Sequence, residues 1–201
     1  MVALLTAAAS AETRIVDGDT LDVDGIRIRL NGIDAPEFGQ DCGNWQCGKA
    51  ALAELVELVG NVTPACKPLG EDGYGRIIAT CVVGGRDIGK EMARQGLAWA
   101  FVKYSDVYMP EEALARASGL GIWGYDSLPA WDYRAKKWES ALQAAPTGCP
   151  IKGNISGNGK IYHAPWSPWY AKTRIDTSKG ERWFCSEAEA VAAGWRAPSW
   201  R

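Results

Sequence analysis

Residues 14–37 read RIVDGDTLDVDGIRIRLNGIDAPE, and this stretch decides the fold that we expect. In residues 26–30, apolar side chains alternate with two arginines, which predicts a strand with one apolar and one charged face. The DGDT sequence at residues 17–20 interrupts the preceding apolar run, which indicates a turn or β-bulge that presents carboxylates at a strand edge. Two rigid pieces therefore deliver acids and a guanidinium to one region.

Two aspartates in this stretch are candidate metal ligands. Asp19 and Asp34 come from neighbouring predicted strands, and carboxylates with backbone carbonyls and water form an oxygen-only site that suits Ca²⁺ best. Mg²⁺ and Mn²⁺ remain alternatives, whereas zinc is disfavoured because residues 12–143 contain no histidine. The alternative is that Asp17 and Asp19 are ordinary turn-forming acids.

Two arginines, a glutamate and a tyrosine complete the candidate site. Arg29 precedes Asp34 by five residues, and Arg76 follows a tight turn, so both can grip a phosphate; otherwise they are solvated strand arginines, like Arg27. Glu37 is held by the preceding proline and can act on a water molecule as a general base or by orienting it. Tyr74 can stack a base or sugar, with core packing as the alternative.

Charge and composition divide the chain. Residues 12–148 carry 14 Lys or Arg against 20 Asp or Glu, net −6, whereas residues 149–201 carry 8 against 4, net +4. We expect a main domain at residues 12–143, a linker at 144–148 and a small, basic, Trp-rich unit at 149–201, called here the C-terminal module.

The N-terminus and the cysteines indicate an oxidising compartment. Residues 1–11 resemble the remnant of an export signal ending in an A-x-A site, with a frayed apolar terminus as the alternative; they are too short to span a bilayer. Six cysteines allow 15 pairings, and proximity suggests Cys42 with Cys47, Cys66 with Cys81, and Cys149 with Cys185. Reduced, buried thiols are the alternative.

Periodicity predicts an α+β protein. Strands are expected at residues 13–23, 26–33, 61–67 and 76–83, and helices at 48–59, 87–96, 110–119 and 129–145. Strands interrupted by a helix suggest a small closed barrel. In the C-terminal module we expect a hairpin formed by residues 160–163 and 182–185, followed by a helix at 187–193.

The order of these motifs resembles the staphylococcal (micrococcal) nuclease family, also called thermonucleases. The matching pieces are DGDT at residues 17–20, RLNGIDAPE at 29–37, DGYGR at 72–76, EMARQGLA at 91–98 and GIW at 121–123. The resemblance covers residues 13–134. It implies a five-stranded OB-fold barrel with three helices, and calcium-dependent hydrolysis of DNA and RNA that leaves 3′-phosphate and 5′-hydroxyl ends.

The resemblance also implies a role for each matching residue. The metal ligands would be Asp19, Asp34 and the backbone carbonyl of Ala35; the catalytic residues Arg29, Glu37 and Arg76; and the substrate contacts Tyr74, Tyr104 and Tyr108. This chain has Gly73 where the type enzyme has a lysine, and residues 103–109 match loosely. The expected protein is a secreted or periplasmic monomer, not inserted in the membrane, that acts on single-stranded or locally opened DNA and RNA.

The acidic main domain should bind a polyanion weakly, so we expect the C-terminal module to add nucleic-acid or cell-envelope contacts. The module loosely resembles sunset-type domains. A zinc site at Cys149, His163 and Cys185 is weighed against a packing role for His163. The rival functions are a noncatalytic nucleic-acid- or protein-binding OB module, and a cell-wall interaction protein whose functional part is the tail.

Overall fold

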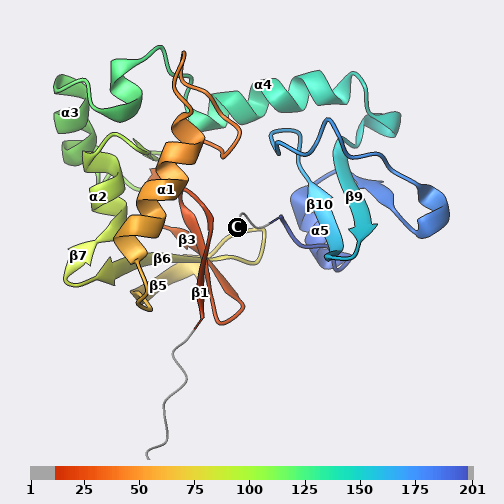
Figure 1. Ribbon diagram of the computed structural model, residues 1–201, viewed down its shortest axis with the longest axis horizontal. Coiled ribbons are helices and arrows are strands. Elements are labelled where there is room, and N and C mark those ends of the chain that lie inside the picture. The colour runs from red at the N-terminus through yellow and green to blue at the C-terminus, as the bar shows by residue number, and fades with distance from the viewer. Residues whose placement is uncertain (1–11, 199–201) are drawn as a thin grey trace, which may run out of the picture.

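A computed structural model describes residues 12–198, so the predicted export signal at residues 1–11 lies outside the described residues. The strands are β1 (Thr13–Asp17), β2 (Thr20–Val23), β3 (Ile26–Leu30), β4 (Ile33–Asp34), β5 (Ala65–Glu71), β6 (Ile77–Val83), β7 (Arg86–Asp87), β8 (Trp99–Ala100), β9 (Ile151–Ser156), β10 (Gly159–His163) and β11 (Arg182–Phe184). The helices are α1 (Cys47–Val59), α2 (Ile88–Arg94), α3 (Met109–Ala117), α4 (Ala130–Leu142) and α5 (Glu187–Ala192), with 3₁₀ turns η1 (Gly121–Gly124), η2 (Pro146–Gly148) and η3 (Thr177–Lys179). The mixed α+β class is as predicted (Figure 1).

The main sheet has the strand order β1-β2-β3-β6-β5, with β7 paired to β6. The first three strands form an antiparallel meander, and β3 pairs in parallel with β6. Within residues 12–198 no pairing joins β1 to β5, so the closed five-stranded barrel is not confirmed. The strand expected at 61–67 begins only at Ala65, after the polar stretch that follows α1.

Strand β3 separates the core from the cleft. Ile28 and Leu30 are 7% and 2% exposed and belong to the main apolar cluster, which Leu55 of α1 and Met92 of α2 complete. Helices α1 and α2 thus cover the apolar face of the sheet. The arginines of β3 alternate with these residues and occupy the opposite face, as the sequence pattern predicts.

All three predicted disulfide pairs are present: Cys42–Cys47, Cys66–Cys81 and Cys149–Cys185. The last pair removes both thiolates from the zinc site that was weighed at the sequence level. His163 is 7% exposed, and its ring contacts Ser167 and Asn154 at 3.3 and 3.2 Å, which confirms the packing role.

The C-terminal module is a three-stranded antiparallel sheet, β10-β9-β11, with α5 packed beside it. The predicted hairpin between residues 160–163 and 182–185 is wrong, because both segments pair with β9 and not with each other. Strand β9 (KGN at 152–154) is glycine-interrupted and polar, so it lacks the apolar alternation that marks a strand. Ile151, Phe184 and Trp195 form the core of the module.

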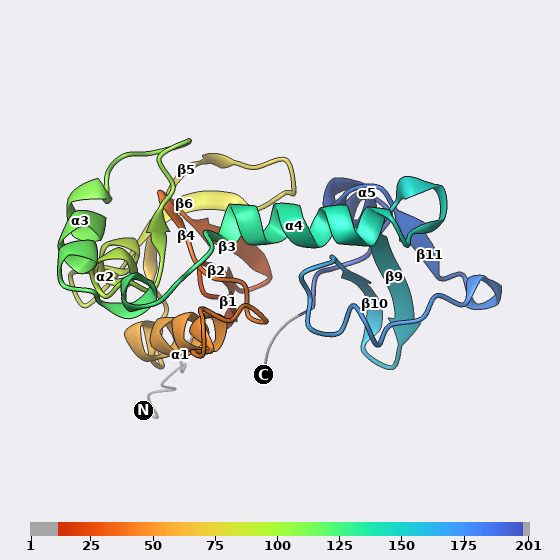
Figure 2. The same cartoon turned by 90° about the horizontal axis from the view of Figure 1, so that it is seen from above.

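Helix α4 belongs to both apolar cores. Its first residue, Ala130, packs in a cluster with Trp99 and Ile122, whereas Trp138, two turns later, packs against the core of the C-terminal module. Figure 2 shows α4 running from one lobe of the molecule to the other. Across residues 12–198, no helix combines the length and the apolar character that a membrane crossing requires.

Candidate active site

Two of the acids flank a glycine at the bulge between β1 and β2. The register of this strand pair shifts just ahead of Asp17. A Cβ atom on Gly18 would lie 2.9 Å from the Cβ atoms of both Ala35 and Ala51, so only glycine permits the close packing of the bulge against α1. The side chains of Asp17 and Asp19 consequently line the same cleft.

Arg29 connects the two aspartates that were predicted to bind metal. Its Nη1 donates to Asp19 Oδ2 at 2.7 Å, and its Nη2 donates to Asp34 Oδ1 at 2.8 Å. Burial by itself lowers the pKa of Arg29, but the charges of Asp19 and Asp34 outweigh burial and raise the pKa above its usual value. The two carboxylates are therefore neighbours across one guanidinium, although they come from different strands.

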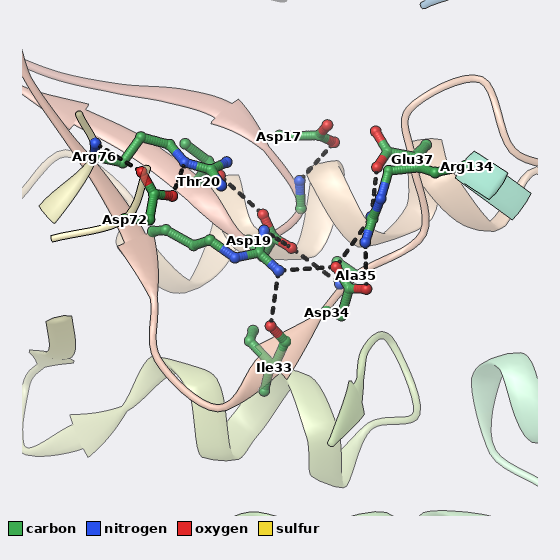
Figure 3. Close-up of polar contacts among 12 residues, drawn as sticks. Asp17, Asp19, Thr20, Ile33, Asp34, Ala35, Glu37, Asp72, Arg76 and Arg134 are labelled. Carbon is green, nitrogen blue, oxygen red and sulfur yellow. Dashed lines mark hydrogen bonds and ion pairs between the residues drawn. The ribbon is translucent and has the colours of Figure 1, made fainter. Parts of the chain in front are cut away.

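A second guanidinium enters the site from α4. Arg134 donates through Nη2 to Asp34 Oδ2 at 2.8 Å and through Nη1 to Glu37 Oε1 at 2.7 Å, with a further bond of 3.1 Å to Asp34 Oδ1 (Figure 3). Asp34 is fully buried, with 0% exposure, and accepts from both arginines. Arg134 thus orients Glu37 and joins it to the Asp19–Arg29–Asp34 chain.

Glu37 has the pKa of a proton acceptor that works near neutrality. Burial raises the pKa of Glu37 to about 7; the charge of Arg134 opposes this rise, and the nearby charges of Asp19 and Asp34 add to it. Burial also raises the pKa of Asp17 well above its usual value, and the charges of Glu37 and Asp19 add to the rise. Asp17 and Glu37 therefore hold a proton more readily than ordinary carboxyl groups do, because burial and the neighbouring acids disfavour their charged forms.

Arg76 lies on the same cleft, on the far side of Asp19 from Glu37 (Figure 3). Its Nε donates to Asp72 Oδ2 at 2.6 Å, and its guanidinium carbon lies 5.3 Å from the ring centroid of Tyr74. The structure records no bond from its two terminal nitrogens to any residue of 12–198. The positive charge of Arg76 still reaches Asp19, where it joins Arg29 in lowering the pKa of that carboxyl against the effect of burial.

Except for Asp34, which is buried behind the two arginines that it binds, these groups line a cleft of about 970 Å³. Tyr74 and Tyr104 are 43% and 68% exposed at its rim, where a base could stack on them. Tyr108, by contrast, is 3% exposed and donates its hydroxyl to the Asp87 carboxylate at 2.9 Å. Tyr108 therefore packs in the core under α3, which corrects the expectation that it contacts substrate.

Comparison with known proteins places this site in a family. The model of the family described as staphylococcal nuclease homologue matches residues 27–125. An uncharacterized endonuclease of Escherichia coli is 34% identical over 132 residues, which are 62% of this chain and 83% of that protein. The chain belongs to the staphylococcal nuclease homologue family.

Other relatives agree with this membership. A micrococcal nuclease of Shigella flexneri is 35% identical over 139 residues, covering 60% of this chain and 77% of that protein. An uncharacterized endonuclease of Haemophilus influenzae is 39% identical over 117 residues, which are 55% of this chain and 63% of the length of that endonuclease. A second family model, ArfC, matches residues 137–197, and the sunset-type resemblance of the C-terminal module corresponds to it only loosely.

The chemistry of the acids in this family member fits a hard divalent cation. Asp19 and Asp34 offer carboxylate oxygens only, and the amide of Ala35 donates to Asp19 Oδ2 at 3.2 Å, which brings that backbone segment beside the pair. Within residues 12–198, no three His, Cys, Asp or Glu side chains converge as a ready-made metal cage. Backbone carbonyl and water oxygens would have to complete the coordination, as hard cations commonly allow.

Sequence reasoning missed three cleft residues of this family member. The DGDT bulge was expected to present carboxylates at a strand edge, but only Asp19 was given a site role, and Asp17 was not. Arg27 was interpreted as solvated, but it lines the cleft because it shares the face of Arg29. Arg134 lies in a segment that reads as an ordinary polar helix, so no local pattern marks it.

Proposed function

We propose that this protein is a nuclease that hydrolyses phosphodiester bonds of DNA and RNA. The observation that carries the proposal is the cluster in which Arg29 is held between Asp19 and Asp34 while Glu37 and Arg76 line the same cleft. Family membership and relatives named as nucleases and endonucleases support it.

Each charged group has a role in this proposal. Glu37, oriented by Arg134 and with a pKa of about 7, accepts a proton from the attacking water or orients that water. Arg29 and the terminal nitrogens of Arg76 stabilise the charge that develops on the phosphoryl oxygens. Water loses a proton to Glu37 or to solvent as it adds to phosphorus, and the P–O5′ bond breaks. The departing 5′ oxygen takes up a proton from solvent while one of these arginines stabilises its charge. The products are a 3′-phosphate and a 5′-hydroxyl.

Calcium is the cation that we propose for this site. Asp19, Asp34 and the backbone carbonyl of Ala35 would hold it, together with water. When bound, the cation would supply positive charge to a phosphoryl oxygen. The rise in the pKa values of Asp17 and Glu37, caused by burial and by neighbouring acids, supports a requirement for such charge, because buried carboxylates repel one another without it.

We also propose that the protein works in an oxidising compartment, as a secreted or periplasmic enzyme. Three disulfides support this location, since cytosolic proteins keep their thiols reduced. The Cys42–Cys47 bridge lies at the start of α1, next to the segment that carries Glu37, so its reduction would disturb the site itself.

The test is degradation of single-stranded and duplex DNA in calcium and then in a chelator, by the wild type and by Glu37→Gln. Removing a general base should lower the rate by roughly a hundredfold or more. Glu57→Gln, on an exposed turn of α1, is the matched control and should retain the wild-type rate. Equal turnover by wild type and Glu37→Gln would refute the role of Glu37, and absence of turnover by the wild type would favour a noncatalytic binding module.

A further inference from the structure

The cleft has two walls, and the C-terminal module forms the second. On one side the lining comes from β3 and from the turn between β5 and β6; on the other it comes from Tyr162, Trp166, Pro168 and Glu187 of the module. The walls meet beyond Glu37, where a Cβ on Gly39 would lie 3.5 Å from the Cβ of Pro168. The candidate active site therefore opens onto the module and not onto bulk solvent alone.

Helix α4 sets the position of the second wall. Arg134 of this helix bonds to the active-site acids, and Trp138, one turn later, packs in the core of the C-terminal module. The ring of Trp138 also lies 6.3 Å from the ring of Trp166, a residue of the wall. A single continuous helix thus connects the catalytic cluster to the module, and we expect the spacing between the walls to be well defined.

Arg27 stands out among the arginines of the cleft. Arg29, Arg76 and Arg134 each donate to a carboxylate, whereas the structure records no hydrogen bond or ion pair from the Arg27 side chain to any residue of 12–198. Burial lowers its pKa, yet the group remains charged, since arginine keeps its proton in proteins. Asp22, opposite Arg27 on β2, is the acid whose charge acts on this guanidinium, but its carboxylate is already paired with Arg14 at 3.3 Å. A partly desolvated guanidinium with no bonded carboxylate attracts an anion strongly.

The opposite wall presents a polar pair to this guanidinium. Tyr162 donates its hydroxyl to Glu187 Oε2 at 2.8 Å. Arg27, Arg76 and Tyr74 line the sheet side of the cleft, and Tyr162 and Glu187 line its module side. In agreement with this placement, the charges of Arg27 and Arg76 act on Tyr162, and the charge of Glu187 acts on Tyr74. Of these two arginines, Arg27 is the better candidate to bind a phosphate, because Arg76 is already bonded to Asp72.

We propose that the C-terminal module and the main sheet together form the substrate-binding cleft, in which Arg27 binds a phosphate next to the scissile one. The polynucleotide strand then passes between β3 and the module, and Glu187 faces that phosphate with a like charge. Arg27 increases affinity for the strand, and Glu187 limits it. This inference depends on the proposed nuclease function for the turnover experiment, whereas the binding experiment requires no catalysis.

The first experiment measures binding without turnover. Fluorescence anisotropy of a labelled single-stranded oligonucleotide in chelator compares the full-length wild type with Arg27→Gln and Glu187→Gln over a range of salt concentrations. Arg27→Gln should weaken binding by about tenfold and make the slope of log affinity against log salt shallower by about 0.7, the value for one phosphate contact on a single strand. Glu187→Gln should tighten binding.

The second experiment measures turnover in calcium on a dinucleotide and on longer oligonucleotides. Arg27→Gln should raise KM for the long substrates by about tenfold more than for the dinucleotide, which has no neighbouring phosphate. Arg86→Gln, an exposed residue of β7, and Glu189→Gln, on α5 but outside the cleft lining, are the controls and should match the wild type.

The two experiments separate the two proposals. If the wild type binds but cleaves nothing, the nuclease function fails, and the changes in affinity still support the shared cleft. If Arg27→Gln and Arg86→Gln bind alike, or if Glu187→Gln leaves affinity unchanged, the shared cleft is overturned even for an active nuclease. Thermal unfolding of Arg27→Gln verifies its fold; Arg27→Lys, which keeps the charge and should keep the salt slope, serves if the glutamine variant does not fold.

Discussion

Removing the guanidinium of Arg134 tests how the active site is held together. Arg134→Met keeps most of the side-chain length while it eliminates three hydrogen bonds, of 2.7, 2.8 and 3.1 Å, to two carboxylates. Asp34 would keep only Arg29, and Glu37 would lose its ion-pair partner. We therefore expect loss of stability together with loss of the orientation of Glu37.

The expected loss of stability follows from the burial of the partners. Breaking a buried ion pair by removing one partner costs about 3–5 kcal/mol. The side chain of Glu37 is 13% exposed at the cleft, so water can solvate part of the remaining charge, and the lower end, about 3 kcal/mol, is expected. For a chain of this size, that corresponds to a fall in Tm of roughly 6–12 °C.

Thermal and urea unfolding followed by tryptophan fluorescence measure this change, since the chain has 10 tryptophans. The control is Arg94→Met, whose ion pair with Glu91 lies on the surface, with the Arg94 side chain 54% exposed. Because water screens such a pair, its loss should change the stability far less than Arg134→Met does. A double-mutant cycle of Arg134→Met with Asp34→Asn should show strong non-additivity because the two residues are in contact. If Arg134→Met lowers the free energy of unfolding no more than Arg94→Met does, or if the cycle is additive, Arg134 does not hold the buried acids in the way proposed here.

Calcium extends this prediction. If the cation binds beside Asp34, it should raise the Tm of Arg134→Met more than that of the wild type, because the variant has more uncompensated acid for the cation to neutralise. Sodium chloride at equal ionic strength distinguishes a specific site from general screening. Equal shifts for both proteins in calcium would count against a cation at this position.

Three further predictions concern packing, the disulfide of the C-terminal module and pH. Gly48→Ala should reduce the free energy of unfolding by about 1–3 kcal/mol, because the new Cβ would overlap the carbonyl of Glu37, and it should also lower the nuclease rate. Gly157→Ala, where a Cβ would meet no neighbouring atom within 4 Å, is the control in the same unfolding and rate assays. Replacing Cys149 and Cys185 by serine should destabilise the module by about 4 kcal/mol, since the bridge closes a separation of 36 residues. Limited proteolysis should then cleave the module first, and unchanged resistance of the module to the protease would contradict this prediction. Burial and the charge of Lys152 lower the pKa of His163 to about 4 from 6.5, so between these pH values the unfolded chain binds a proton that the folded chain does not. As the pH falls from 6.5 to 4, the free energy of unfolding should therefore decrease by up to about 1.4 kcal/mol per pH unit. His163→Gln should flatten this part of a pH series of unfolding midpoints, and an equally steep series would contradict the assignment.

The alternation in residues 26–30 predicted more than a strand. Because side chains on a strand point to opposite faces in turn, the same pattern placed Ile28 and Leu30 in the core and Arg29 in the cleft. The same period placed Arg27 on the face of Arg29, but Arg27 was interpreted as a solvated residue and not as part of the cleft. The disulfides were equally local, since each pair could be chosen by proximity along the chain.

The residues that sequence reasoning missed or misplaced depend on distant contacts. Arg134 bonds to acids 97 and 100 residues away, and its own helix has the pattern of any polar helix. Tyr108 follows a loosely matching loop, and only the packing of α3 on α2 shows that its ring is buried and its hydroxyl bonds to Asp87. Strand β9 is recognisable only from its two partners.

Local sequence was enough to predict the acids, the arginines of the short strands, the mixed class of fold and the family, because turn chemistry and the two-residue period of a strand act over a few neighbouring positions. It could not predict that α4 brings Arg134 to Glu37, or that the C-terminal module lines the same cleft as Arg29. Both depend on how a helix packs into two separate cores, and such packing is set by the shapes of surfaces that are far apart in the chain.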